Sequence, residues 1–159
     1  VSFDLDIYYK GFFTDSAFTM TVGEKASPAI KNMIKITESS MWEGIEQVKP
    51  GAHIGDISAA VEKVLRKGHL GVIENYIGHG IGKTMHESPE VPNYGKKGTG
   101  PILKEGMVIA VEPMLNLGTR EIYLLDDDWT IVTRDGKPSA HFEHTVVVRD
   151  DGYEILTGE

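Results

Sequence analysis

The first 22 positions of the chain have the apolar and β-branched composition of strands, and positions 1–7 alternate apolar and polar side chains. Residues 1–9 and 12–22 are rich in Val, Phe, Ile, Tyr and Thr, and the pair Lys10-Gly11 lies between them. Two such runs joined by a short turn that contains glycine predict a β-hairpin. Gly23 closes it.

From Ser27 onward the apolar residues recur at helical spacing. Ser27-Pro28 supplies an N-cap and a favoured first helical residue, and Pro50-Gly51 ends the segment. A second helix is predicted from Asp56 to Gly68. The apolar positions are Ile30, Met33, Ile34, Met41 and Ile45 in the first helix and Ile57, Val61, Val64 and Leu65 in the second. Because each helix has one apolar side, we expect both to cover one face of a sheet.

After Gly71 the pattern is one of short strands and glycine-rich loops. A long loop is predicted over residues 84–104, where proline and glycine recur, and a loop of that length is usually functional or mobile. The predicted strands are 107–112, 121–125, 129–133, 139–149 and 153–156. A hairpin, two helices and a mostly antiparallel sheet make an α+β fold, with residues 1–159 in a single domain.

Composition excludes several classes of function. The 159 residues carry 24 Asp+Glu against 16 Lys+Arg, a net charge of -8, so we expect no binding to nucleic-acid phosphates. Cysteine is absent, which excludes disulfides, thiolate metal sites and cysteine nucleophiles. Any metal must therefore be held by oxygen and imidazole. No apolar run approaches the roughly 20 residues of a membrane span, and the chain is expected to be soluble and cytoplasmic.

The candidate chemistry lies in four carboxylates and one imidazole, namely Asp4, Asp15, His79, Glu112 and Glu143. Asp4 and Asp15 belong to strands that should pair, so we expect their side chains opposite or diagonal on one face. Two carboxylates that close repel each other unless a cation or a shared proton compensates. The alternative is a pair of ordinary solvated acids, and Asp6 lies on the same face as Asp4 by strand alternation.

The remaining candidates occupy glycine-rich or apolar surroundings. Residues 78–82 place three glycines around His79, which lets backbone approach closely, although such a histidine also suits a structural or surface position. Glu112 ends an apolar strand, and Glu143 interrupts another. A buried carboxylate needs hydrogen bonds or a metal, and for Glu112 the alternative is a strand end that reaches solvent. Alternation places His141 and Glu143 on one face.

Four strings together resemble the type I methionine aminopeptidases. They are DLDIYYKGFFTDS at residues 4–16, GHGIGKTMHESPEVPNYG at 78–95, GMVIAVEP at 106–113 and SAHFEHTVVV at 139–148. The resemblance implies a pita-bread fold, in which two similar halves enclose a metal site. This chain would hold the closing hairpin of the first half and the complete second half, with most of the first half missing.

The resemblance also implies an activity and a ligand set. The activity is that of a hydrolase, a metallopeptidase that removes the N-terminal methionine from nascent proteins by water attack at a dinuclear centre of Co, Mn, Fe or Zn. Asp15 and Glu143 would bridge the two divalent ions, Asp4 would complete one, and His79 with Glu112 the other. Glu112 would take and return the proton of the attacking water. Nascent polypeptide N-termini would be the substrate, and association with the ribosome is a further expectation.

Three more residues receive roles from the resemblance. His86 would hydrogen-bond the substrate near the scissile amide and assist catalysis. Met85 and Trp129 would flank the pocket for the methionine side chain, although each also suits a core position.

One departure from the family pattern lies beside a candidate ligand. His141 stands where the family usually carries Gln, two residues before Glu143. It is expected to contact and orient the metal ligands without binding metal itself. The family's upstream histidine has no counterpart here. Two alternatives stay open: a proline-directed aminopeptidase of the same fold, and an inactive fragment or binding scaffold.

Overall fold

The computed structural model describes residues 1–23, 25–68 and 70–158. The helices and strands of this part are β1 (Ser2–Tyr9), β2 (Phe12–Thr19), α1 (Pro28–Ile45), α2 (Ile54–Lys67), β3 (Gly71–Val72), β4 (Gly78–Gly80), β5 (Glu87–Val91), β6 (Val108–Val111), β7 (Met114–Asn116), β8 (Ile122–Leu124), β9 (Ile131–Thr133), β10 (Ser139–His141), β11 (Glu143–Arg149) and β12 (Gly152–Ile155). Neither helix of these residues is long and apolar enough to cross a bilayer.

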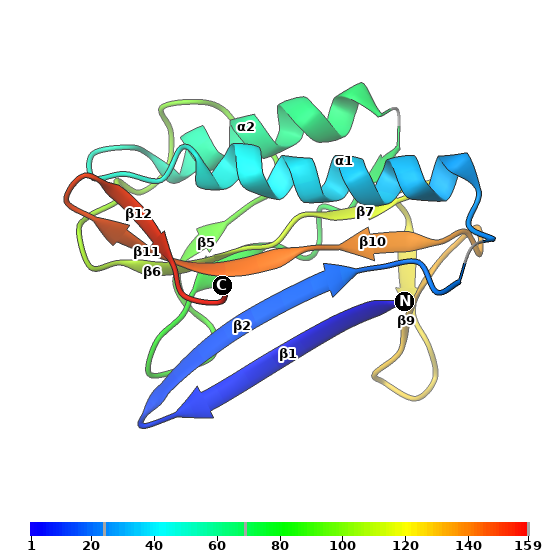
Figure 1. Ribbon diagram of the computed structural model, residues 1–159, viewed down its shortest axis with the longest axis horizontal. Coiled ribbons are helices and arrows are strands. Elements are labelled where there is room, and N and C mark those ends of the chain that lie inside the picture. Colours follow the sequence, from blue (N-terminus) through cyan, green and yellow to red (C-terminus); the bar gives the residue numbers. More distant parts are fainter. Residues whose placement is uncertain (24, 69, 159) are drawn as a thin grey trace.

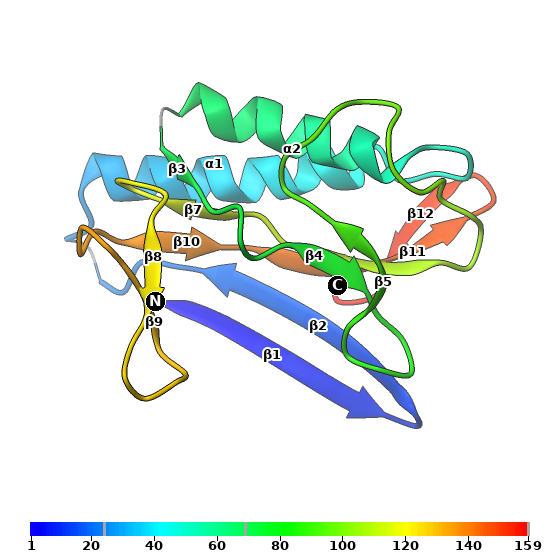
Figure 2. The same ribbon diagram turned by 180° about the vertical axis from the view of Figure 1, so that it is seen from behind.

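A twisted antiparallel sheet carries both helices on one side, and the N-terminal hairpin forms its edge (Figure 1). In the described residues this sheet has seven strands in the order β1-β2-β11-β6-β4-β5, with β12 beside β11. Smaller sheets join β10, β7 and β3, and β8 with β9. Seen from behind, β1 remains the strand farthest from the helices (Figure 2). The predicted α+β layout with helices on one face is therefore confirmed.

The two helices begin with the capping chemistry that their sequences supply. Ser27 Oγ accepts a hydrogen bond from the Ile30 amide at 3.3 Å, and Pro28 takes the first helical position. The second helix begins two residues before the predicted Asp56. The Asp56 carboxylate instead accepts from the His53 amide at 2.8 Å, so it closes the first turn from inside the helix.

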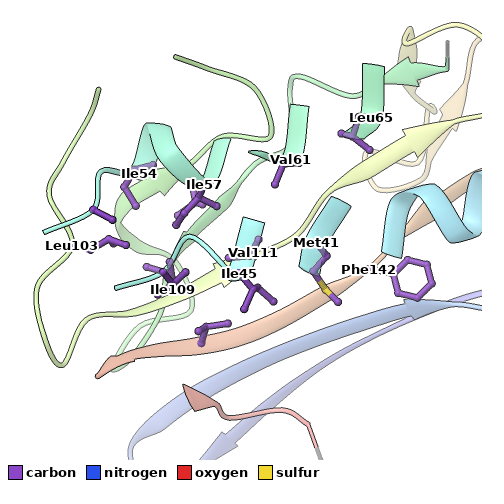
Figure 3. Close-up of a cluster of buried hydrophobic side chains, with 14 of the residues drawn as sticks. Met41, Ile45, Ile54, Ile57, Val61, Leu65, Leu103, Ile109, Val111 and Phe142 are labelled. Atoms are coloured by element: carbon purple, nitrogen blue, oxygen red, sulfur yellow. The ribbon is translucent and has the colours of Figure 1, made fainter. Parts of the chain in front are cut away.

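The core lies between the helices and the sheet. Figure 3 shows Ile45 and Met41 of α1 and Ile57 of α2 directed toward side chains of the sheet, among them Ile109. The predicted apolar faces supply this layer, since Met33, Met41, Ile45, Ile57, Val61 and Leu65 are all buried. Burial of this apolar surface attaches the helices to the back of the sheet. The opposite face is thereby left for the polar residues described below.

Three predicted boundaries in the sheet were wrong. The predicted loop 84–104 contains β5, whose hydrogen bonds come from β4, and an edge strand of this kind tolerates Pro89. The run after Pro113 forms the short strand β7, which pairs with β10. The single strand predicted over 139–149 is broken at Phe142, so that β10 and β11 enter different sheets. For β7 and for the two halves of the broken run the partner strands are distant in sequence, and local composition does not identify them. For β5 the partner is the preceding strand β4, but the proline-containing sequence of β5 resembles a loop.

Truncation of Ile57 tests the helix-to-sheet core. Its side chain is fully buried, so we expect Ile57→Val to lower the free energy of unfolding by about 0.5–1.5 kcal/mol and Ile57→Ala by about 2–5 kcal/mol. Urea denaturation measures both. Lys63→Ala, on the exposed side of the same helix, is the matched control and should change stability little. Equal losses in all three variants would contradict this account of the core.

Candidate metal centre

The candidate ligands form two adjacent rows across one face of the large sheet. In the first row Asp4 of β1 lies opposite Ala17 of β2, and Ala17 lies opposite Glu143 of β11. Glu112 follows β6 one step beyond the pairing of His144 with Val111, which places it across from Glu143. Side chains of directly opposed residues share a face of the sheet. Neighbouring strands thus bring distant carboxylates together.

The second row lies two residues along each strand and therefore on the same face. Asp6 of β1 is opposite Asp15 of β2, and Thr145 of β11 is opposite Ala110 of β6. His79 of β4 belongs to this row, because the next residue, Gly80, pairs with Ile109. The predicted hairpin geometry is confirmed, with Asp4 diagonal to Asp15 and Asp6 directly across from it.

Two overlapping groups of side chains could each hold an ion. Asp15, His79 and Glu143 offer ligand atoms within 4.8 Å of one another, as do Glu112, His141 and Glu143. His79 Nε2 lies 3.3 Å from Glu112 Oε1 and 3.9 Å from Asp15 Oδ2. Glu143 belongs to both groups. A carboxylate common to two groups is placed as a bridging ligand would be.

The orientation of His79 follows from its glycine neighbours. Its Nδ1 lies 2.9 Å from the Gly80 carbonyl oxygen, which can only accept, so Nδ1 carries the proton and Nε2 keeps its lone pair toward the carboxylates. A Cβ on Gly80 would come within 2.3 Å of the Ser88 carbonyl oxygen, and one on Gly78 within 2.3 Å of the Ala110 carbonyl oxygen. The glycines thus let β4 pack against both neighbouring strands, as predicted from the sequence.

The carboxylates of the cluster lack cationic side-chain partners. Among the described residues no Lys or Arg forms an ion pair with Asp15, Glu112 or Glu143, and only imidazoles approach them. Burial, followed by the charges of Asp6 and Asp4, raises the pKa of Asp15 to about 7. Burial, followed by the charges of Glu112 and Asp15, raises the pKa of Glu143 to about 10. In both residues the pKa is raised because the ionised carboxylate would be buried beside other negative charges, with no cationic partner.

Unsatisfied polar atoms point to a cation as the missing partner. Asp15 Oδ1, Glu143 Oε1 and His141 Nε2 are buried and have no hydrogen-bond partner. Buried polar atoms in folded proteins are nearly always paired, so three in one cluster require an explanation. Carboxylate oxygens with imidazole nitrogen form a donor set that suits Mn, Fe, Co or Zn. The residues present therefore fit divalent metal.

Two threonine hydroxyls set the backbone beneath the cluster. Thr145 Oγ1 donates to the Asp15 carbonyl oxygen at 2.8 Å and accepts from the Asp15 amide at 2.9 Å. Thr19 Oγ1 makes the same pair of bonds to His141, each at 2.9 Å. These two contacts flank the short ladder between β2 and β11. Asp15 and His141 are thus fixed by matching interactions at its two ends.

The remaining predicted site residues lie around this cluster. The Asp4 side chain is 57% exposed and its Oδ2 lies 3.8 Å from His141 Nδ1. His86 is exposed, and its ring meets His79 edge-on with 4.3 Å between centroids. Met85 is half-buried nearby in sequence. Trp129 is 84% exposed in the turn between β8 and β9, so its alternative assignment to the core was wrong.

Two further residues enter the site beyond the predicted ligands. His141 approaches three of the carboxylates, although the sequence interpretation placed it only behind the ligands. Asp6 directly faces Asp15, although the family pattern had favoured Asp4. Strand alternation carried the signal in both cases, because it put each residue on the same face as a predicted ligand.

Comparisons with known proteins agree on one family. The sequence pattern of metallopeptidase family M24 matches residues 1–150. The chain is 42% identical over 157 residues to methionine aminopeptidase 1 of Bacillus subtilis, covering 99% of this chain and 63% of that protein. The crystal structure of methionine aminopeptidase from Rickettsia prowazekii is similar, with a TM-score of 0.94 and 42% identity over 99% of this chain and 63% of that one.

More distant likenesses concern the fold alone. The prolidase from Pyrococcus horikoshii has a TM-score of 0.75 at 23% identity, covering 99% of this chain and 39% of that chain. These similarities confirm the predicted pita-bread fold and the resemblance to methionine aminopeptidases. The chain spans about 63% of the length of the Bacillus relative.

Stability of the metal-free chain should fall as pH rises. Because the pKa values of Asp15 and Glu143 are raised, the folded chain binds more protons than the unfolded chain above their ordinary values near 4. The stabilisation is full below those values and is lost as pH rises toward about 7 for Asp15 and about 10 for Glu143. Melting in chelator should therefore give a lower Tm at pH 8.5 than at pH 5.5.

Substitution at Glu143 isolates its share of this dependence. Glu143→Gln cannot ionise, so its Tm should decline less steeply over the same pH range. Glu105→Gln, which removes an exposed acid, should leave the slope unchanged. If Tm declined equally with pH in the unsubstituted chain, Glu143→Gln and Glu105→Gln, ionisation of Glu143 would make no contribution to the pH dependence of stability.

Proposed function

Because the chain belongs to metallopeptidase family M24, we propose that it binds two divalent ions and hydrolyses the peptide bond after an N-terminal methionine. The observation that carries this proposal is the pair of ligand groups that share Glu143. Each group combines carboxylate oxygen with one imidazole nitrogen. Bound ions would supply Lewis-acid polarisation of the substrate carbonyl and a nucleophilic water at neutral pH.

The ligand roles are proposed from the rows of the sheet. Asp15 and Glu143 lie on adjacent central strands and would be shared between the ions. Glu112 and His79, only 3.3 Å apart, would complete one ion, and Asp4 at the edge strand would complete the other. A cation among these groups would satisfy the unpaired oxygens of Asp15 and Glu143 and offset their repulsion. The metal identity proposed is Mn, Fe, Co or Zn.

Glu112 is proposed to move the proton of the attacking water. Its two carboxylate oxygens face different imidazoles, Oε1 toward His79 at 3.3 Å and Oε2 toward His141 at 3.6 Å. It directly follows β6, and its buried side chain lies between the two imidazoles. A carboxylate in that place can accept a proton from water and return it to the leaving amine.

Recognition of the substrate is proposed to begin at His86. Its exposed ring stands against the edge of His79 and is free to donate a hydrogen bond to a peptide carbonyl beside the cluster. Met85, the residue before it, and Trp129, in its exposed turn, are proposed to contact the methionine side chain. Flexible thioether and aromatic surfaces suit a thioether ligand.

The substrate proposed is the N-terminus of a nascent polypeptide, with ribosome association and a cytoplasmic location as further parts of the proposal. The methionine reading is favoured over a proline-directed one by similarity. Identity is 42% to the Bacillus methionine aminopeptidase but 23% to the Pyrococcus prolidase. The two substrate classes therefore provide a direct test.

Hydrolysis of matched peptides by metal-loaded protein tests the proposed function. We expect release of methionine from Met-Ala-Ser, no release from Ala-Pro-Ser, and loss of turnover in Glu112→Gln by a factor of about 10² or more. Chelator-treated protein is the control, and metal content is measured in parallel. Preference for Ala-Pro-Ser would overturn the methionine assignment. Two bound ions without hydrolysis of either peptide would indicate a metal-binding scaffold.

Removal of the His86 imidazole separates substrate contact from metal binding. His86→Ala should lower kcat for Met-Ala-Ser by about 10²-fold, because a donor to the developing negative charge is lost. The metal content should stay unchanged, since His86 lies outside both ligand groups. His53→Gln, at the start of α2, is the matched control and should retain activity. A metal-depleted His86→Ala protein would instead place His86 among the ligands.

A further inference from the structure

We propose that His141 is a direct metal ligand, so that each of the two ions has its own imidazole and the centre favours metals that prefer nitrogen. This inference rests on the proposed dinuclear centre and extends its ligand set. It departs from the one-imidazole set that the family resemblance implies. The basis is the position of the His141 ring, its unpaired nitrogen and its fixed backbone.

The ring nitrogen of His141 lies among carboxylate oxygens at the distances of a shared cation. Nε2 is 3.6 Å from Glu112 Oε2 and 3.9 Å from Glu143 Oε2, and these three residues form one of the two ligand groups. The spacing is too long for hydrogen bonds but leaves room for an ion between the atoms. Nε2 is buried and lacks a hydrogen-bond partner. An ion would satisfy all three groups together.

The two imidazoles take complementary positions about Glu112. His79 approaches Oε1 at 3.3 Å, and His141 approaches Oε2 at 3.6 Å. His79 belongs to the group with Asp15, and His141 to the group with Glu112, while Glu143 is common to both. Glu112, proposed above as a ligand beside His79 through Oε1, would then also turn its Oε2 toward the ion of His141. One nitrogen therefore falls to each group.

The far nitrogen of each ring also faces an acceptor, as metal-bound histidines usually do. His79 Nδ1 lies 2.9 Å from the Gly80 carbonyl oxygen, and His141 Nδ1 lies 3.8 Å from Asp4 Oδ2. For His79 this hydrogen bond places the proton on Nδ1 and leaves Nε2 free to bind metal. For His141 the negative charge of Asp4 favours the same tautomer, at a distance longer than a hydrogen bond. Asp4 thus lies on the Nδ1 side of the ring, where its charge can orient the His141 imidazole.

The backbone of His141 is fixed as firmly as that of Asp15. The Thr19 hydroxyl bonds both the amide and the carbonyl of His141 at 2.9 Å, as the Thr145 hydroxyl bonds both groups of Asp15. Thr19 is buried, so these bonds do not compete with water. A ligand needs this kind of support, because metal sites tolerate little displacement of their donors.

The consequence is a change in metal preference. Glutamine at this position would offer an amide oxygen, whereas histidine offers an imidazole nitrogen. Imidazole suits Zn, Fe, Co and Ni, while Mn and Mg are bound better by oxygen. We therefore expect this chain to discriminate more strongly for Co²⁺ over Mn²⁺ than its His141→Gln variant does.

Isothermal titration of metal-free protein with Co²⁺ and with Mn²⁺ tests the preference without reference to catalysis. His141→Gln should weaken binding of one Co²⁺ by more than about 100-fold and change Mn²⁺ binding much less, because removal of a group that only orients a ligand costs about 10–100-fold. His53→Gln is the control for loss of a histidine remote from the cluster, and both its affinities should be unchanged. Circular dichroism checks that each variant is folded.

Proton NMR of the Co²⁺-loaded, unsubstituted chain gives a second and independent reading. Two imidazole N–H signals should be shifted by the paramagnetic ions, one each from His79 and His141, and one should vanish in His141→Gln. A single shifted signal in the unsubstituted chain would overturn the inference even if the variant failed to fold. Two bound ions with equal selectivity in both proteins would also overturn it, leaving the proposed centre intact. Binding of no ion would overturn both.

Discussion

The repulsion among carboxylates gathered on one sheet face is the interaction on which the rest of this structure depends. Asp15, Glu112 and Glu143 are buried side by side without a Lys or Arg partner in the described part of the chain. Such a group either holds protons, as the raised pKa values of Asp15 and Glu143 indicate, or holds cations. Binding of metal would convert a destabilising feature into a favourable one, which couples metal affinity to folding.

The sheet is built to hold that charge in place. One face packs against α1 and α2 through the apolar core (Figure 1). The opposite face carries the two rows of ligands. Small residues occupy positions in both rows, Ala17 between Asp4 and Glu143 and Ala110 between Thr145 and His79, so the spaces above them are left for carboxylates and for what they bind. Threonine hydroxyls join the backbone at both ends of the short β2–β11 ladder. The apolar face of the strands therefore holds the sheet rigid against the helices, and the opposite face of the same strands carries the charged side chains.

Local patterns predicted most of the elements and the chemistry of the site. The hairpin, both helices and the apolar sides of those helices followed from composition, capping residues and periodicity, all of which act within a few residues. The strand β5 was missed because its pairing comes from β4, and its proline-containing sequence resembles a loop. The break at Phe142 was missed for a related reason, since β7 and β6 draw the two halves of the run into different sheets.

The sequence by itself determined which side chains could bind metal and which of them share a face of their own strand, because strand alternation is a local property. The tertiary structure decided which of them meet. Pairing among β1, β2, β11, β6 and β4 sets the register, and that register depends on hydrogen bonds between segments as far apart as Asp15 and Thr145. It also brought His141 up to Glu112, a contact between the ends of two different strands that no periodicity within one strand can specify.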